Sequence, residues 1–386
     1  MVTVAARFGE RNRERMSSKG IARHRAPSED HREVSGPGSD GSGEGREGAS
    51  RDHLIDTEPL DDTQFESHPD WGRSTDSICV FAPSISLIVT IEAVDREPPW
   101  GEIHLHPAGQ GFWIARLLAQ LGYRALLCGP IGGEAGSVLR TLVPHWGVTL
   151  RGIRTVSASP CYVDDRRTGD RIHIARDQRP TLRRHEVDDL YGRAMEIALE
   201  ADVTVVTGRH PEDTLPLHVF ERMGADLASM GVPVIGDLHG PELAAFLEQG
   251  RLEILKVSDE ELVSDGIIED DSESSIRNAI EDLASRNIGW IVVSRAERGA
   301  LVSVDGRIHR AVQPALTVVD RRGSGDSMTA ALVAAWLREL GPERAIRLGC
   351  AAGAANVTRR GLGSASAELI EQLADQVEIE SIEGNT

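Results

Sequence analysis

The sequence predicts an α/β fold in which helices cover both faces of a mostly parallel sheet. Between about residues 185 and 340, short apolar runs typical of strands alternate with longer helical patterns. Runs such as Val203–Thr207 and Trp290–Ser294 are rich in β-branched residues, and their alternation with helices implies a parallel sheet covered on both faces. With 386 residues, the chain is long enough for one large α/β domain or two ordinary ones.

The first 75 residues differ in composition from the rest of the chain. They are rich in Gly, Ser, Pro, Asp, Glu and Arg, and such a segment cannot bury enough apolar surface to offset its ordering entropy. We therefore expect a disordered tail over 1–75, a folded domain over 76–380 and a C-terminal tail over 381–386. The basic start of the first tail is consistent with a docking arm or with a solvated segment, and the solvated segment is favoured.

The folded part is expected to open with strands at 77–83, 87–91 and 102–108. A Gly turn then leads into a helix over 112–121, which Gly122 closes. A strand at 125–129, a helix ending near Trp146 and a charged β-hairpin at 161–175 follow. After the alternating units come two short strands within 300–312 and two consecutive helices at about 325–340 and 342–357.

Composition excludes several classes of function. The formal net charge of −19 argues against nucleic acid or an anionic membrane as partner, because neither polyanion is attracted to such a surface. The four cysteines have no CxxC spacing, which fits a reducing compartment and offers no thiolate metal site. No run of about 18 apolar residues appears, so we expect a cytoplasmic protein without membrane contact.

The stretch from Val318 to Leu332 is the most informative part of the sequence. Two glycines bracket Ser324 where an extended segment turns into an Ala-rich helix, so backbone N–H groups and the helix dipole are expected to favour an anion there. Asp326 follows directly. It is either the N-cap of the helix or a base that takes a proton from a hydroxyl attacking a phosphoryl group, and this stretch alone does not decide between them.

Three other polar segments follow strand ends, where ligands usually bind in α/β sheets. They are Asp237, the segment Lys256–Glu261 and the turn after Ser294. Each has a structural explanation: a strand-end Asp is often an N-cap, and Ser258 with Glu261 has the spacing of a capping box. Their occurrence together favours a ligand site.

These segments carry a resemblance to the ribokinase-like (PfkB) carbohydrate kinases. Asp320–Asp326 resembles the second signature of that family, Asn/Asp-Thr and one residue followed by Gly-Ala-Gly-Asp. Ala108–Arg116 is similar to the first signature, Lys256–Glu261 to a Lys-x-Asn-x-x-Glu element, and Ser294–Gly299 to a Thr/Ser-x-Gly-x-x-Gly nucleotide turn. Order and spacing agree over about 76–375, and the 1-phosphofructokinase branch is the most similar one.

The resemblance implies transfer of the γ-phosphoryl group of ATP to a sugar hydroxyl, with Mg²⁺. It gives Asp326 the role of base, and it gives the N–H groups of Gly323, Ser324 and Gly325 the role of holding the phosphoryl group. The implied nucleotide-site positions are Lys256, Glu261, Ser294, Gly299 and Asn356, with Glu261 holding the metal through water. For Lys256, a solvated strand-end lysine is the alternative interpretation.

The acceptor side departs from the family pattern. Gln110 and Trp113 replace the Lys and Asn of the first signature, and Ser86 replaces an aspartate that grips sugar hydroxyls. Gln110 can hydrogen-bond a hydroxyl but cannot neutralise a phosphate. The implied substrate positions are Ser86, Gly109, Gln110, Trp113 and Arg171. Arg171, with Arg166 and Arg167 nearby, either binds a sugar phosphate or belongs to a solvated hairpin turn.

The resulting hypothesis is a ribokinase-like α/β domain with a small β lid, built from strands near 86–108 and 161–175. We expect an ATP-dependent kinase of a sugar or sugar phosphate, with no nucleic-acid or membrane partner. Lid strands of this family often pair between subunits, so the resemblance also implies a possible homodimer through the lid. The alternatives are a nucleoside or polyol kinase of the same fold, and a sugar-binding regulatory protein that has lost turnover.

Overall fold

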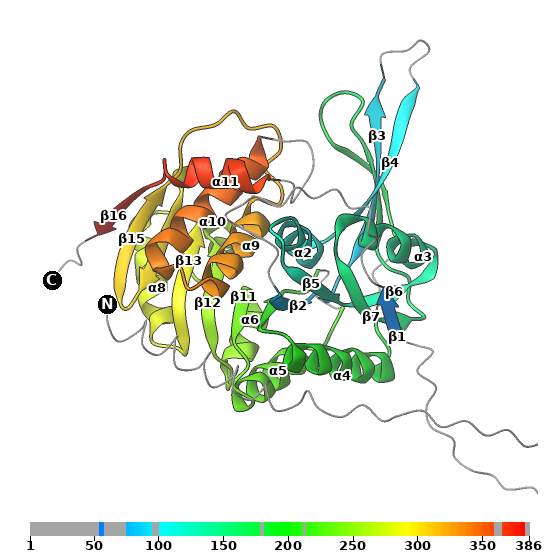
Figure 1. Cartoon of the computed structure of the whole chain (residues 1–386), viewed down its shortest axis with the longest axis horizontal. Helices are drawn as coiled ribbons and strands as arrows, with labels where there is room; N and C mark the ends of the chain where they lie inside the picture. The colour runs from blue at the N-terminus through cyan, green and yellow to red at the C-terminus, as the bar shows by residue number, and fades with distance from the viewer. Residues whose placement is uncertain are drawn as a thin grey trace, which may run out of the picture. The chain divides into compact units, whose positions relative to one another are not determined.

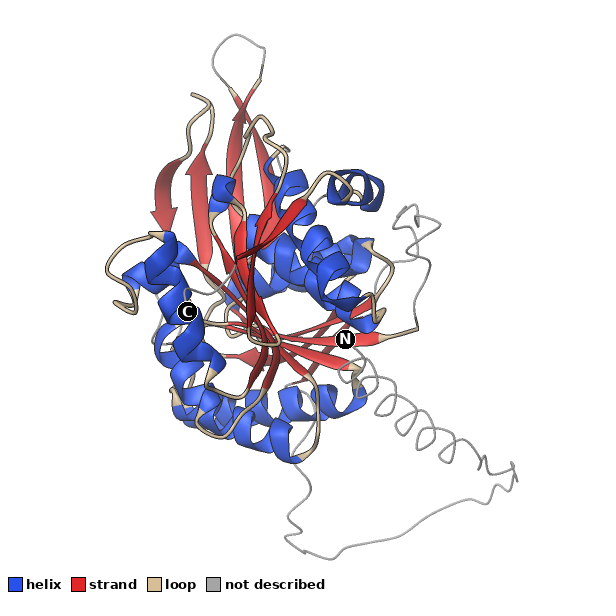
Figure 2. Cartoon of the chain, turned by 90° about the vertical axis from the view of Figure 1, so that its left-hand side faces the viewer, coloured by secondary structure: helices blue, strands red, loops and turns tan. Residues whose placement is uncertain are grey.

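The computed structural model describes residues 54–57, 75–94, 100–177, 181–210, 214–358 and 365–382. All of them belong to one compact unit, Asp52–Thr386. They form a 12-stranded sheet with helices on both faces and a separate four-stranded sheet (Figures 1 and 2). The α/β fold with a mostly parallel sheet is thereby confirmed. Within the described residues, no helix is both long enough and apolar enough to cross a lipid bilayer.

The large sheet has a parallel centre and antiparallel edges. The strand order of the parallel part is β7 (Thr149–Thr155), β5 (Arg124–Cys128), β2 (Ser77–Phe81), β10 (Val203–Thr207), β11 (Val234–Asp237), β12 (Leu252–Ser258) and β13 (Ile288–Ser294). Beyond β13, β14 (Ala300–Val304), β15 (Arg307–Val312) and β16 (Glu378–Ile382) continue as antiparallel strands. β6 (Pro130–Gly132) pairs with β7 in parallel.

Side chains of the central strands point alternately to the two faces of the sheet and pack in two hydrophobic cores, one on each face. In β2, Ile78 and Val80 pack in the first core, whereas Cys79 and Phe81 pack in the second. A strand buried on both faces must be apolar at successive positions, which is the pattern the sequence shows.

Helices on the two faces of the sheet complete the two cores. The first core includes α2 (Gln110–Gln120), α3 (Gly133–Leu142), α9 (Ser324–Leu337), α10 (Gly341–Val357) and α11 (Ala367–Ala374). The second includes α4 (Arg184–Glu200), α5 (His218–Ser229), α6 (Gly240–Leu247), α7 (Asp259–Ser264) and α8 (Glu273–Ala284). The 3-10 turns are η2 (Val143–Trp146) and η3 (Ala296–Arg298). Gly122 follows α2 with φ 87°, as expected of a residue that closes a helix.

The expectation of a disordered segment over 1–75 is wrong for four of its residues. β1 (Leu54–Thr57) pairs antiparallel with β7, and Ile55 is buried at the sheet edge. The short apolar pair Leu54-Ile55 is the signal that the bulk composition concealed. Apart from Thr75, the rest of that range lies outside the described residues.

The four-stranded sheet has the order β4-β3-β8-β9. Its strands are β3 (Ser86–Ala93), β4 (Gly101–Ala108), β8 (Cys161–Asp165) and β9 (Ile172–Arg176), in the segments expected to form a lid. β3 and β4 extend away from the α/β body in Figure 1. We call this element the small sheet.

Cross-strand register gives the small sheet two different faces, because directly paired residues share a face. One face carries the rows His104–Thr90–Asp164–His173 and His106–Ile88–Tyr162–Arg176. The other carries Ile103–Ile91–Asp165–Ile172 and Leu105–Val89–Val163. We call these the polar face and the apolar face.

Candidate active site

The polar segments predicted at strand ends meet at one edge of the large sheet. β11, β12 and β13 are parallel neighbours, with Asp237 paired to Lys256 and Ser258 to Ser294 in register. Their carboxyl ends therefore lie side by side. The N-terminus of α9 comes to the same place, because Gly325 lies against the side chain of Lys256.

The turn into α9 places Asp326 inside the first turn of the helix. Gly323 is the N-cap, with a left-handed φ of 71°, and no side chain caps the helix. The interpretation of Asp326 as the N-cap is therefore wrong. The N–H groups of Ser324 and Gly325 fall among the first four of the helix, which have no partner within the helix.

Lys256 and Asp237 form a buried ion pair beneath this turn. Lys256 Nζ lies 3.2 Å from Asp237 Oδ1, and the two side chains are 5% and 1% exposed. The hydroxyl of Thr329, on α9, donates to Asp237 Oδ2 at 2.7 Å. The alternative of a solvated Lys256 is wrong, and Asp237 anchors both the lysine and the helix.

Burial and mutual charge shift the pKa values of this cluster. Burial and the Asp237 charge raise the pKa of Asp326 from 3.8 to about 8, against the opposing effect of Lys256. Burial also raises the pKa of Asp237, partly offset by Lys256. Burial alone would lower the pKa of Lys256, but the charges of Asp237, Glu261 and Asp326 outweigh it, and that pKa is raised. The cluster thus holds a carboxyl group that titrates near neutral pH.

Glu261 joins the cluster from the start of α7. Ser258 caps that helix, and Glu261 Oε2 accepts a hydrogen bond from the Ser258 N–H at 2.7 Å, so the capping box is present. Burial acts to raise the pKa of Glu261, but the Lys256 charge and the Ser258 N–H outweigh it, and the pKa is lowered. Glu261 is therefore both a member of the capping box of α7 and an ionised carboxylate next to the turn.

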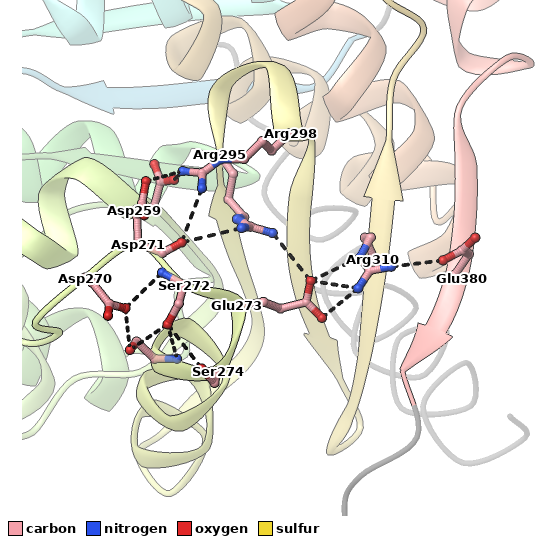
Figure 3. Close-up of polar contacts among 11 residues, drawn as sticks. Asp259, Asp270, Asp271, Ser272, Glu273, Ser274, Arg295, Arg298, Arg310 and Glu380 are labelled. Atoms are coloured by element: carbon pink, nitrogen blue, oxygen red, sulfur yellow. Dashed lines mark hydrogen bonds and ion pairs between the residues drawn. The ribbon is translucent and has the colours of Figure 1, made fainter.

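The turn after Ser294 joins β13 to β14 and is held by ion pairs. Gly299 has φ 83°, and a Cβ atom there would overlap with the carbonyl oxygen of Ala311. Arg298 Nη2 lies 2.6 Å from Asp259 Oδ2 and 2.7 Å from Asp271 Oδ2 (Figure 3). Since Asp259 lies between Lys256 and Glu261 in the chain, this pair joins the turn to the Lys256–Glu261 segment.

Asn356, on α10, contacts the turn that precedes α9. Its side chain is fully buried, and its Nδ2 donates to the carbonyl oxygen of Arg322 at 2.6 Å. The structure thus places this predicted nucleotide-site residue beneath the turn that precedes α9, where it fixes the backbone.

A cavity of about 720 Å³ lies between the polar face of the small sheet and the turn before α9. Four of the five predicted substrate positions line it: Ser86, Gly109, Gln110 and Trp113. Gln110 Nε2 also lies 3.5 Å from the carbonyl oxygen of Asp237, which links the cavity to the ion-paired cluster. The first signature therefore does form the wall of a pocket.

Arg171 is not among the residues that line the cavity. Its Nη2 donates to Asp320 Oδ2 at 3.2 Å, and its Nη1 lies 3.5 Å from Asp164 Oδ2, with the side chain 14% exposed. Both predicted interpretations of Arg171 are therefore wrong. It is neither a free arginine that awaits a phosphate nor part of a solvated hairpin turn. Arg171 instead joins the small sheet to the turn before α9.

Sequence reasoning missed several residues of the cavity wall. They are Tyr162, Asp164, His173, Arg176, His210 and Arg322. The usable signal was the alternation within the hairpin, which puts Tyr162 and Asp164 on one face of their strand. The position of Arg322 depends on how the turn meets the small sheet, which no local pattern encodes.

Comparison with known proteins shows which proteins this chain is similar to. A family model described as pfkB family carbohydrate kinase matches residues 83–369. A 1-phosphofructokinase of Vibrio cholerae serotype O1 is 24% identical over 282 residues, which cover 73% of this chain and 88% of the relative.

Solved structures of two such proteins share the fold. Phosphofructokinase-2 from Escherichia coli in complex with fructose-6-phosphate has a TM-score of 0.66 at 22% identity, covering 78% of this chain and 100% of that chain. A possible 1-phosphofructokinase from Thermotoga maritima has a TM-score of 0.67 at 15% identity, covering 80% and 100%. The match over residues 83–369, together with this shared fold, shows that the chain belongs to the pfkB family of carbohydrate kinases, which transfer a phosphoryl group to a sugar hydroxyl.

Proposed function

We propose that the protein is an ATP-dependent, Mg²⁺-requiring kinase of a sugar phosphate, similar in activity to its 1-phosphofructokinase relative. The observation that carries this proposal is the position of Asp326. It lies in the first turn of a buried helix, its pKa is raised to about 8, and Lys256 is among the charges acting on it. A pure binding protein needs neither a carboxyl group tuned near neutral pH nor a buried lysine beside it.

In this proposal, Asp326 takes the proton from the attacking hydroxyl of the acceptor. A base is most efficient when its pKa lies near the working pH, which is the effect of burial and Asp237 on Asp326. The N–H groups of Gly323, Ser324 and Gly325 hold the transferring phosphoryl group at the N-terminus of α9, where negative charge is favoured. Lys256 adds positive charge beside Gly325.

The residues around α9 fit a hydrated Mg²⁺ ion. Within the described ranges, no group of three or more His, Cys, Asp or Glu side chains forms a metal cage. Mg²⁺ usually keeps several waters and binds through one or two carboxylates and substrate phosphates, so such a cage is not required. Asp237, Glu261 and Asp326 surround the single charge of Lys256, and a cation offsets this excess of carboxylates. We assign the ion to Glu261 through water; when bound, it neutralises charge on phosphoryl oxygens.

The nucleotide is assigned to the turn formed by Ser294–Gly299, next to the start of α7. Ser294 ends β13 beside Ser258, and the positive φ of Gly299 lets the backbone turn back into β14. Asn356 supports the site by fixing the carbonyl group of Arg322. These positions lie at the carboxyl ends of parallel strands, where ligands bind in such sheets.

The acceptor is assigned to the cavity under the small sheet. A volume of about 720 Å³ is of the size that binds small metabolites. Arg176, Arg322 and His210 line it with Gln110, so an anionic acceptor such as a sugar phosphate has guanidinium partners even though the usual lysine is absent. The relative from Escherichia coli was solved with fructose-6-phosphate, a ligand of this class.

We further propose a homodimer that pairs through the apolar face of the small sheet. Ile103, Leu105 and Ile172 on that face are 64%, 43% and 51% exposed. Large aliphatic side chains gathered on one sheet face favour burial against another protein surface, and a second copy of the chain supplies the same surface. The four free cysteines fit a reducing, cytoplasmic setting for this assembly.

An ATP-consumption screen tests the proposed function. Hexoses, pentoses, their phosphates and nucleosides are offered with Mg²⁺, and Asp326→Asn serves as the control. We expect turnover of a sugar phosphate that disappears in the variant. Turnover of nucleosides alone would replace the proposed substrate, and sugar binding without any turnover would contradict the kinase assignment.

A further inference from the structure

Asp164 is a buried carboxylate in the wall of the acceptor cavity. It lies on β8, its side chain is 1% exposed, and its Oδ1 is 2.7 Å from Nδ1 of His173 on β9. A register irregularity between Val163 and Asp164 interrupts the pairing of the two strands at this point. Such irregularities re-aim side chains and are frequent next to active sites.

His173 is the exposed member of this pair. It lines the cavity, its side chain is 62% exposed, and its Nδ1 is engaged by Asp164. A carboxylate at Nδ1 fixes the orientation of an imidazole ring and leaves Nε2 for a ligand. The pair therefore presents one oriented ring nitrogen to whatever occupies the cavity.

The other oxygen of Asp164 faces Arg171. Asp164 Oδ2 lies 3.5 Å from Arg171 Nη1, and both atoms are buried without a hydrogen bond to any described residue. Leaving buried polar atoms without partners is costly, and this ion pair is the contact that compensates both atoms. Asp164 therefore contacts His173 through one oxygen and Arg171 through the other.

Arg171 continues the chain of contacts to the turn before α9. Its Nη2 donates to Asp320 Oδ2 at 3.2 Å, and Asp320 Oδ1 accepts from the N–H of Arg322 at 3.1 Å. Arg322 itself lines the cavity and directly precedes Gly323. Side chains thus connect the small sheet to the turn that the proposed function uses for phosphoryl transfer.

We propose that His173 contacts the acceptor and that Asp164, Arg171 and Asp320 are positioning residues, which couple occupancy of the cavity to the geometry of the Gly323 turn. This inference rests on the proposed function. A contact between the acceptor and His173 Nε2 fixes the ring, the ring fixes Asp164, and Asp164 with Arg171 holds Asp320 and the backbone of Arg322. Small misplacements at a reacting centre are costly, so such a connection raises kcat only when the correct acceptor is bound.

Amide hydrogen exchange in the free protein tests the coupling without any turnover. Exchange of the segment 318–327 is compared between wild type, Asp164→Asn and Arg171→Met. We expect exchange faster by roughly threefold or more in both variants, because each weakens the connection through Arg171, while the longer contact of Arg166 Nη2 with Asp320 Oδ2, at 3.7 Å, remains. Asp165→Asn is the matched control: the neighbouring carboxylate pairs with Arg167 at the hairpin turn, and its loss should leave the segment unchanged.

Unchanged exchange in the Arg171→Met variant would overturn the coupling. Arg171→Met is the more decisive variant, because Asp164 is fully buried and Asp164→Asn risks misfolding. Asp320→Asn tests the same contacts from the side of the turn. Exchange that increases equally in Asp165→Asn would also overturn it, since the effect would then come from the hairpin and not from this chain of contacts.

Steady-state kinetics test the contact to the acceptor. With an acceptor from the screen, His173→Gln should raise its KM about tenfold and leave the KM for ATP unchanged, while Arg171→Met should lower kcat about tenfold. The double variant Asp164→Asn/Arg171→Met should lose no more than its worse single variant, because both act on one connection. Additive losses, or equal effects on both KM values, would contradict the proposal. Absence of any turnover contradicts the proposed function instead, and the exchange comparison still decides the coupling.

Discussion

Asp326, the proposed base, also lowers the stability of the folded protein as the pH rises. Its pKa is about 8 in the folded protein against 3.8 ordinarily, so the folded state binds more protons than the unfolded state between these values. Stability therefore falls as pH rises through this window. We expect Asp326→Asn to lower turnover by roughly 10²–10⁴-fold and to unfold at a higher Tm than wild type above pH 8.

Thermal unfolding from pH 4 to pH 9, with turnover measured in parallel, checks this expectation. The Tm advantage of the variant should shrink as pH falls toward the ordinary pKa of an aspartate, where the wild-type carboxyl is protonated in both states. Wild-type turnover in Asp326→Asn would exclude the residue as the base.

The pH dependence of kcat/KM should report the same group. Because the base must be deprotonated, kcat/KM of the wild type should rise with pH through about 8. Asp237 raises the pKa of Asp326, so Asp237→Asn should move this midpoint toward acid. Asp265→Asn, which removes a carboxylate paired with His239, is the matched control and should leave the midpoint in place. If the midpoint of kcat/KM is the same in Asp237→Asn as in the wild type, a group other than Asp326 titrates.

The residues that we propose for phosphoryl transfer were easier to predict from the sequence than those that we propose for the acceptor, for a physical reason. Asp237, Lys256 and Asp326 follow strand ends or a Gly turn, and the carboxyl ends of parallel strands necessarily meet at one edge of the sheet. Asp164 and Arg322 come together only through the approach of the small sheet to the large one. Side-chain alternation gives the face of a strand but not what that face meets.

Among elements, the first turn of α9 leaves no space for a side chain at Gly325. A Cβ atom there would lie 2.6 Å from Lys256 Nζ and 3.2 Å from its Cε. We expect Gly325→Ala to displace Lys256 from Asp237, lower kcat and reduce the free energy of unfolding by about 1–3 kcal/mol.

Chemical denaturation and turnover measure both effects. Gly192→Ala is the control: Gly192 also lies in a helix, nothing surrounds its Cβ position, and the change should stabilise the protein by about 1 kcal/mol. Full activity in Gly325→Ala would show that Lys256 need not stay in its observed position.

The turn from β13 to β14 depends on Arg298. Asp259 is 5% exposed, so Arg298→Ala removes a guanidinium partner from a buried carboxylate, which should cost about 1–3 kcal/mol and raise the KM for ATP. Arg310→Ala is the control, because Arg310 pairs with the more exposed Glu273 and Glu380 at the sheet edge, where ion pairs contribute up to about 1 kcal/mol (Figure 3). If both variants had the same KM for ATP, the turn would not be part of the nucleotide site.

Elements with a strong local pattern were predicted, and elements that depend on distant partners were not. The helix closed by Gly122 and the hairpin at 161–175 carry their own turn signals, and both are present. β7 (Thr149–Thr155) and β1 (Leu54–Thr57) went unrecognised. β1 consists of four residues within a polar segment and exists as a strand because β7 offers it a free edge.

For the whole molecule, we propose different roles for the two faces of the small sheet: acceptor binding for one and dimer formation for the other. Part of the polar face, including Tyr162 and His173, lines the cavity to which we assign the acceptor. The apolar face carries Ile103 and Ile172, which are paired through Ile91 and Asp165 into one row across all four strands. A monomer leaves this row in water, and only a second surface relieves that exposure.

The apolar face of the small sheet should determine whether the protein is a dimer. The wild type should sediment as a dimer at micromolar concentration, and Ile103→Asp/Ile172→Asp should sediment as a monomer, because charges on a buried apolar interface have no partners. Leu199→Asp is the control, since Leu199 is 49% exposed but lies on α4, away from the small sheet. The polar face and its cavity belong to one chain, so the monomeric variant should still bind the acceptor. A wild type that sediments as a monomer, or a control that dissociates equally, would contradict pairing through this face.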